Sequence, residues 1–186
     1  MVDEKVMVIL NSFYSELSKK NDYFKPYLDR NASCEKWIQG EFIHWLYKLR
    51  NSGQIQEARL EQNYGPRAGL CDIGFTVNKK EYWCELQVIV TNYGMAGKPI
   101  TNQVKHVMED ANKLKKNIQL DSSLIIFFAY PFSSSGRNDQ QWASTHLLKL
   151  KDLLDFKGSP YIIKIDDKYE MRIYTASIKN ERENKL

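Results

Sequence analysis

The chain has 186 residues, of which 42% are hydrophobic and 27% are charged, and its formal net charge is +4 at pH 7. This composition excludes a disordered chain, and the length suffices for one domain with its own hydrophobic core. The longest apolar run, residues 124–130, is much shorter than the ~20 residues of a membrane helix. The charged residues near the start are not typical of a signal peptide, and the three cysteines have no metal-binding spacing. We therefore expect a cytoplasmic protein with free thiols and no membrane partner.

The first half of the chain predicts two helices followed by three strands. Apolar residues at helical spacing indicate helices at residues 4–19 and 35–50, and in the second helix the stripe consists of Ile38, Phe42, Trp45 and Leu49. Alternating segments separated by short polar breaks then predict strands at residues 55–64, 69–77 and 81–90. Because residues 78–80 make a short turn, we expect the last two of these strands to pair in an antiparallel manner.

The second half predicts a helix, a buried strand and a C-terminal addition. Thr101 is placed to cap a helix with an apolar face, and residues 123–130 are so apolar that we expect a central strand covered on both sides. A helix at residues 140–150 and a hairpin formed by 161–165 and 169–174 follow. We predict a single domain over residues 1–178 and a frayed tail at 179–186.

Three polar residues interrupt the apolar pattern of the second and third strands. Asp72 lies between Cys71 and Ile73, while Glu85 and Gln87 point to the same side of the third strand. If residues 78–80 form the turn, Asp72 lies close to opposite Glu85 on the antiparallel pair. Two carboxylates meeting there repel each other unless a cation lies between them. The alternative is that each acid faces solvent or pairs with a lysine.

These residues resemble the signature of the PD-(D/E)XK nuclease superfamily, which has the restriction endonuclease-like fold. The aspartate of that signature corresponds to Asp72, and the strand motif corresponds to Glu85-Leu86-Gln87. The resemblance covers residues 35–130, where the predicted order of elements is the αβββαβ order of the family. It implies an α/β fold with a mixed central sheet flanked by helices, to which this chain adds an N-terminal helix and a C-terminal helix with a hairpin.

Many members of the superfamily also carry a glutamate on the helix that precedes the sheet. Glu41 has that place in this sequence, near Ile38 and Trp45 at the border of the apolar stripe. The alternative for Glu41 is an exposed glutamate that simply favours the helix. The resemblance implies catalytic residues Glu41, Asp72, Glu85 and Gln87. Asp72, Glu85 and Glu41 would bind Mg²⁺, for which Mn²⁺ can substitute.

The sequence departs from the family at the motif lysine, which is replaced by Gln87. Some members of the superfamily have glutamine there and remain active. Lys105 or Lys98 could supply the missing charge, and Gln103 resembles a glutamine that shapes the site in some relatives. The alternative for all three is a solvated surface position.

The resemblance therefore implies a metal-dependent nuclease that hydrolyses phosphodiester bonds in DNA as an endonuclease. It is compatible with a homodimer. Because the lysine is missing, an inactive nuclease-fold domain that serves binding or assembly is the alternative. A nuclease for RNA or for branched DNA is a third reading, since the sequence does not separate these substrates. A net charge of +4 permits nucleic acid as a partner without requiring it.

Overall fold

The computed structural model describes residues 3–64, 69–91, 99–118 and 122–179. The first part is helical, with helix α1 (Glu4–Ser18), the 3-10 turn η1 (Asn21–Phe24), the short helix α2 (Lys25–Asp29) and helix α3 (Glu35–Asn51). The middle part contains strands β1 (Glu57–Asn63), β2 (Leu70–Val77) and β3 (Lys80–Val90), then helix α4 (Ile100–Asn117) and strand β4 (Ser123–Ser133). From α3 to β4 the elements therefore follow the predicted order of helix, three strands, helix and strand.

The C-terminal part is one interrupted helix followed by three strands. Helix α5 (Asp139–Gln141), the π-helical segment η3 (Trp142–Leu147) and helix α6 (Leu148–Lys151) follow one another directly. Strands β5 (Leu154–Phe156), β6 (Tyr161–Lys164) and β7 (Tyr169–Ile178) complete the described chain. The predicted helix and hairpin are confirmed, whereas β5 is too short to give a sequence pattern.

The strands form one mixed sheet in the order β1-β2-β3-β4-β7-β5, with β6 also paired to β7. Strands β1, β2 and β3 pair antiparallel, β3 and β4 pair parallel, and β7 runs antiparallel to its three neighbours. The protein is thus of the α/β class. Strand β7 lies inside the sheet, so the C-terminal hairpin is part of the sheet and not an appendage. Among the residues that the structure describes, no helix has both the length and the apolar character needed to cross a lipid bilayer.

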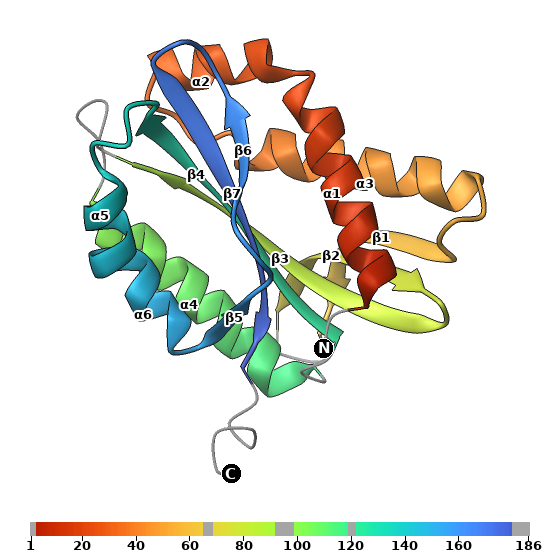
Figure 1. Cartoon of the computed structure of the whole chain (residues 1–186). Coiled ribbons are helices and arrows are strands. Elements are labelled where there is room, and N and C mark those ends of the chain that lie inside the picture. The colour runs from red at the N-terminus through yellow and green to blue at the C-terminus, as the bar shows by residue number, and fades with distance from the viewer. Residues whose placement is uncertain (1–2, 65–68, 92–98, 119–121, 180–186) are drawn as a thin grey trace.

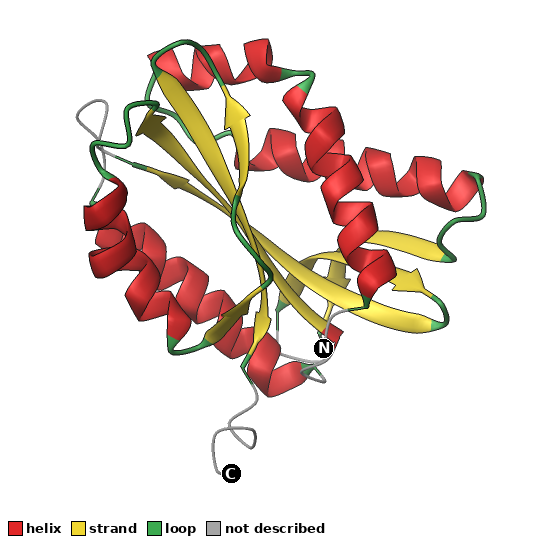
Figure 2. Cartoon of the chain, in the orientation of Figure 1, coloured by secondary structure: helices red, strands yellow, loops and turns green. Residues whose placement is uncertain are grey.

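Helices cover both faces of the sheet. Helices α1 and α3 lie on one face, and α4 lies with α5 and α6 on the other (Figure 1, Figure 2). Strand β4 contributes to both cores: Leu124, Ile126 and Phe128 pack toward α1 and α3, whereas Ile125 and Phe127 pack toward α4. Every residue from Ser123 to Phe132 is buried, which confirms the predicted central strand.

Two predictions at element ends are wrong. Helix α4 begins after Pro99, whose side chain makes no capping hydrogen bond, so Thr101 lies inside the first turn and does not cap the helix. Strand β4 continues through Pro131 to Ser133, because its pairing with β7 resumes at Phe132 after an irregularity in register. Both differences follow from tertiary pairing and packing, which a local pattern does not contain.

The turn between β2 and β3 positions the polar residues of these strands. Asn78 and Lys79 both have positive φ (52° and 65°), as two-residue hairpin turns of type I′ require. The turn fixes a register in which Val77 pairs with Lys80 and Ile73 pairs with Cys84. One residue further along the same register, Asp72 comes opposite Glu85, as predicted.

Candidate active site

The ladder of hydrogen bonds between β2 and β3 ends at the pair Ile73 and Cys84. We call the region beyond this pair the fork; it comprises Asp72 of β2 and residues 85–90 of β3. Strand β3 continues to Val90 along β4, while its other edge bonds to side chains. Asp72 accepts a hydrogen bond from the Leu86 amide (Oδ2, 2.9 Å), and Glu35 accepts one from the Val88 amide (Oε2, 3.2 Å). The fork thus brings carboxylates against the backbone of β3, where a strand would otherwise pair.

Gln103 completes this row at the end of β3. Its side chain accepts a hydrogen bond from the Val90 amide (2.7 Å) and donates one to the Val90 carbonyl (2.8 Å). The side chain thus imitates a neighbouring strand and ties the start of α4 to β3. Gln103 had been expected either to shape the site or to lie in solvent. The structure places it at the border of the fork, bonded to backbone.

Asp72 and Glu85 form a carboxyl pair inside the fork. Glu85 is only 3% exposed, its Oε1 accepts a hydrogen bond from the Tyr64 hydroxyl (2.6 Å), and its Oε2 lies 3.4 Å from the Asp72 amide. The Tyr64 ring stacks on Trp83 with ring centroids 5.4 Å apart. Among the described residues, no lysine, arginine or histidine forms an ion pair with either carboxyl.

Burial controls the protonation of this pair. The pKa of Glu85 is raised to about 8, chiefly by loss of water; the Tyr64 hydrogen bond opposes this rise, and the nearby carboxyls of Asp72 and Asp110 contribute to it. Burial also raises the pKa of Asp72, although the Leu86 amide favours its charged form. Without a cation, the pair therefore tends to hold a proton near neutral pH.

Gln87 faces helix α4, where it meets an acid that the sequence analysis missed. Its Nε2 donates a hydrogen bond to Asp110 Oδ2 (2.7 Å), and the ammonium of Lys113 bonds the other oxygen of Asp110. Asp110 is 4% exposed and lies between Val107 and Leu114 on the apolar face of α4. A lone acid on an apolar helical stripe was the sequence signal that could have identified it.

Lys113 is not the simple surface lysine that its sequence position favours. Its hydrogen bond to Asp110 raises its pKa, and the negative charges of Asp110, Glu85 and Asp72 add to this effect against partial burial. The side chain is 51% exposed, so its stem extends through solvent while its ammonium returns to the buried acid. Lys113 is thus a cation that α4 places beside the fork. Lys36 of α3 is a second one, since its charge opposes the rise that burial causes in the pKa of Asp72 and of Glu35.

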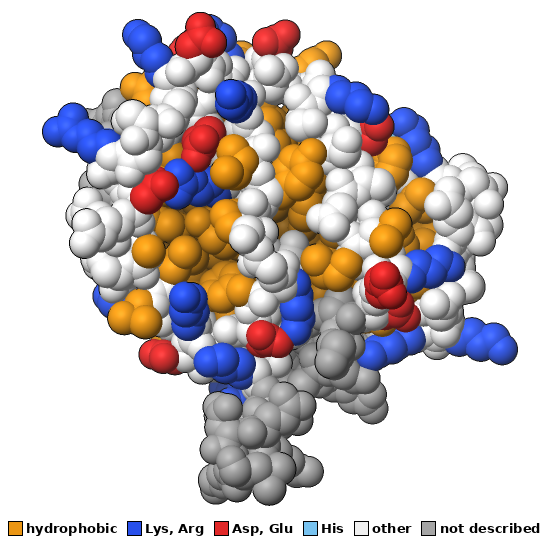
Figure 3. All heavy atoms as spheres, viewed as in Figure 1, with side chains coloured by type: hydrophobic (Ala, Val, Ile, Leu, Met, Phe, Trp, Pro, Cys, Tyr) orange, Lys and Arg blue, Asp and Glu red, His pale blue; other side chains and the backbone are white. Residues whose placement is uncertain are grey.

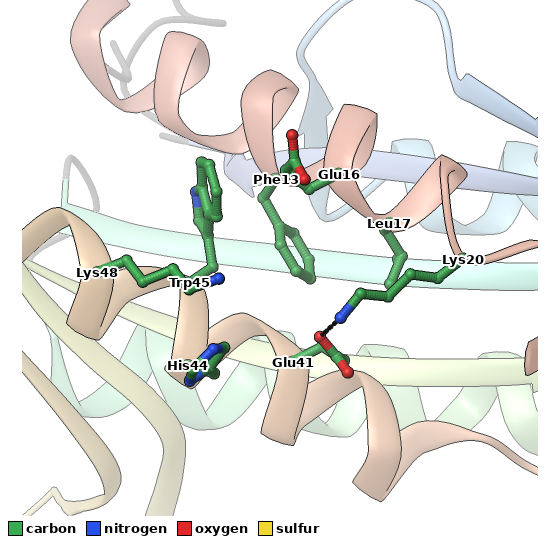
Figure 4. Close-up of a pocket in the computed structure, with 8 residues that line it drawn as sticks. All are labelled: Phe13, Glu16, Leu17, Lys20, Glu41, His44, Trp45 and Lys48. Carbon is green, nitrogen blue, oxygen red and sulfur yellow. Dashed lines mark hydrogen bonds and ion pairs between the residues drawn. The ribbon is translucent and has the colours of Figure 1, made fainter.

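The structure does not bring Glu41 to the fork. Its carboxylate pairs with Lys20 in a pocket between α1 and α3, as Figure 4 shows. The pocket is lined by Phe13, Glu16, Leu17, Lys20, Glu41, His44, Trp45 and Lys48. Leu46 is fully buried, whereas Trp45 of the predicted stripe packs against the core only in part and lines this pocket together with Glu41.

Glu35 supplies the helical glutamate at the fork. It lies in the first turn of α3, six residues before Glu41, which on a helix corresponds to a different face. Burial raises the pKa of Glu35, the Val88 amide lowers it, and the charges of Asp72 and Asp110 raise it again. Glu35 therefore belongs electrostatically to the same group of acids as Asp72 and Asp110.

The two lysines considered as substitutes for the motif lysine are not part of this group. Lys105 extends into solvent with a side chain 72% exposed and pairs with Glu109 at 3.6 Å. Lys98 lies outside the described residues. Within the described part of the chain, no group of three or more His, Cys, Asp or Glu side chains has the arrangement of a preformed metal site.

Comparisons of the chain with protein-family models, with curated proteins and with solved structures find no significant match in any of the three.

Proposed function

We propose that the protein is a metal-dependent nuclease that hydrolyses phosphodiester bonds in DNA, with its active site at the fork. The observation that carries this proposal is the carboxyl pair of Asp72 and Glu85 on adjacent strands. The order of elements from α3 to β4 supports the finer proposal that the sheet is a restriction endonuclease-like core of the PD-(D/E)XK type. The fork lies beside its third strand, where the resemblance implies the catalytic residues.

The donors at the fork fit a hard divalent cation such as Mg²⁺. Asp72 and Glu85 offer carboxylate oxygens, and Glu35 lies at the border, bonded to the Val88 amide, without completing a group of three among the described residues. A cation bound by these oxygens would stabilise negative charge on the attacked phosphate and relieve the repulsion within the pair. Mn²⁺, which accepts less regular coordination, should support comparable activity.

Gln87 can orient the attacking water but cannot deprotonate it. An amide has no basic lone pair at neutral pH, and its Nε2 already donates to Asp110. Its carbonyl oxygen therefore remains to accept a hydrogen bond from water or to contact a cation. The proton of the water must leave to solvent, to the substrate phosphate or to another carboxylate, and cleavage should become faster as pH rises through the neutral range.

The alternative is a nuclease-fold module that binds nucleic acid or assembles with partners without cleavage. A specific observation favours it: Asp72 Oδ2 and Glu85 Oε1 already accept internal hydrogen bonds, from the Leu86 amide and the Tyr64 hydroxyl. Basic side chains do not decide between the two. On the face shown in Figure 3, lysine and arginine are scattered among acidic residues and do not form one basic patch.

Cleavage assays on defined substrates test the proposal. Supercoiled plasmid, a branched DNA duplex and an RNA hairpin are each incubated with Mg²⁺ or Mn²⁺, and the wild type is compared with Asp72→Asn. The same substitution in the exposed strand β5, Asp155→Asn, is the matched control. We expect the wild type and the control to nick plasmid, and Asp72→Asn to be inactive. If only RNA is cleaved, the proposed substrate is RNA and not DNA. If no substrate is cleaved and calorimetry detects no metal binding, the binding or assembly module replaces the nuclease.

A further inference from the structure

Asp110 is the acid whose environment the proposed function does not yet explain. It lies on the apolar face of α4 and is almost completely buried, and an isolated buried carboxylate is costly. Two side chains offset this cost from opposite sides of the carboxylate: Gln87 from strand β3 and Lys113 from the next turn of α4. Asp110 is therefore a bridge between a surface ammonium and the strand that carries Glu85.

This bridge fixes the orientation of the Gln87 amide. A carboxylate only accepts hydrogen bonds, so the group of Gln87 that faces Asp110 must be the NH₂ group and not the carbonyl. The ammonium of Lys113 bonds the other oxygen of Asp110, so the carboxylate is held from two sides and its placement against the Gln87 amide depends on Lys113.

We propose that Lys113 is a positioning residue of the active site, which acts through Asp110 to hold the Gln87 carbonyl oxygen available for water or a cation. This inference rests on the proposed nuclease function. It assigns to α4 the ammonium that the strand motif lacks at Gln87. Lys113 touches neither substrate nor cation in this proposal, and its effect passes through one carboxylate.

A charge-removing substitution with a matched control tests the proposal. Lys113→Met keeps the length of the side chain and removes its ammonium, and Lys116→Met makes the same change at an exposed position of α4. We expect Lys113→Met to lower kcat about 10- to 100-fold, as substitutions behind a metal ligand do, with KM for plasmid within about twofold. Affinity for Mn²⁺, measured by calorimetry, should fall as well. Lys116→Met should match the wild type in all three measurements.

A second substitution separates positioning from a structural role. Lys113→Arg keeps a cation beside Asp110 and leaves the Gln87 carbonyl in place, and we expect it to retain Mn²⁺ affinity and much of kcat. Gln87→Met removes the carbonyl itself and should lower both, with or without Lys113→Met, and thermal unfolding verifies that all variants are folded. If Lys113→Met equals Lys116→Met in kcat and in Mn²⁺ affinity, this inference is wrong while the proposed function stands. A wild type that neither cleaves nor binds Mn²⁺ overturns both.

Discussion

Two groups of carboxylates at the sheet, each with a buried glutamate, are balanced in different ways. At one end of β7, Arg172 bonds both Glu170 and Asp139 at 2.7 Å and lies over the Phe132 ring. At the fork, Asp72 and Glu85 lie against each other and are held by a hydroxyl and by backbone amides. The first group contains its own cation, whereas among the described residues no cation forms an ion pair with Asp72 or Glu85.

This difference indicates which group is a structural element and which is a candidate site. A buried acid that has an arginine partner is neutralised in the folded protein and needs nothing further. Two buried carboxyls without such a partner must share a proton or attract a cation from solution. The fork therefore holds two buried carboxyl groups without an ion-pair partner, an arrangement that is typical of sites that bind metal or perform acid–base chemistry.

The largest effect should be a pH dependence of stability that originates at the fork. The folded pKa of Glu85, about 8, is above its usual value of 4.5, so folded Glu85 keeps a proton that the unfolded chain has released. The metal-free protein should lose stability as pH rises from about 4.5 to about 8, by up to about 5 kcal/mol, and stay level above that range.

Urea unfolding with a chelator present at a series of pH values measures this loss. Glu85→Gln removes the titrating group, so its stability should vary much less over the same window and should equal or exceed that of the wild type near pH 8. An unchanged slope in Glu85→Gln would show that the fork is not under electrostatic stress.

A substitution in the other group should destabilise the protein at every pH near neutrality. Arg172→Met leaves Glu170, which is 9% exposed, without its cation, and we expect a loss of about 3 kcal/mol in the free energy of unfolding. Adding Glu170→Gln should recover most of the loss, because the charge that remains without its partner, on Asp139, is half exposed to solvent. Cleavage by the Arg172→Met protein below its unfolding temperature should be normal. A loss of cleavage without a loss of stability would mean that the two groups are not functionally distinct.

The smallest effect is expected for Glu41, whose pair with Lys20 is partly exposed like other surface ion pairs. Glu41→Ala should cost at most about 1 kcal/mol and leave cleavage unchanged. Glu35→Gln, made at the border of the fork, should reduce cleavage and Mn²⁺ affinity while it preserves the helix. The plasmid nicking rates of the two variants show whether Glu35 or Glu41 takes part in cleavage. An inactive Glu41→Ala variant would show that Glu41 belongs to the active site.

The sequence by itself determined the parts of the molecule that depend on local signals. Alternation along β2 and β3 placed Asp72, Glu85 and Gln87 on one face, and the short turn between the strands set the register that brings the two acids together. The almost unbroken apolar run of β4 identified a strand covered on both faces. These features are local because the period of a strand and the length of a turn fix them within about twenty residues.

Only the tertiary structure decided which helical residues reach the fork. Glu35 and Glu41 lie on different faces of α3, and the packing of this helix brings Glu35 to β3 and Glu41 to Lys20. The apolar stripe of α4 marks Asp110 as unusual, but its partner does not follow from the local pattern, because Gln87 lies more than twenty residues earlier and Lys113 reaches the site only through Asp110. Helix packing angles and rotations arise from side-chain fit between distant segments, and a local pattern cannot specify that fit.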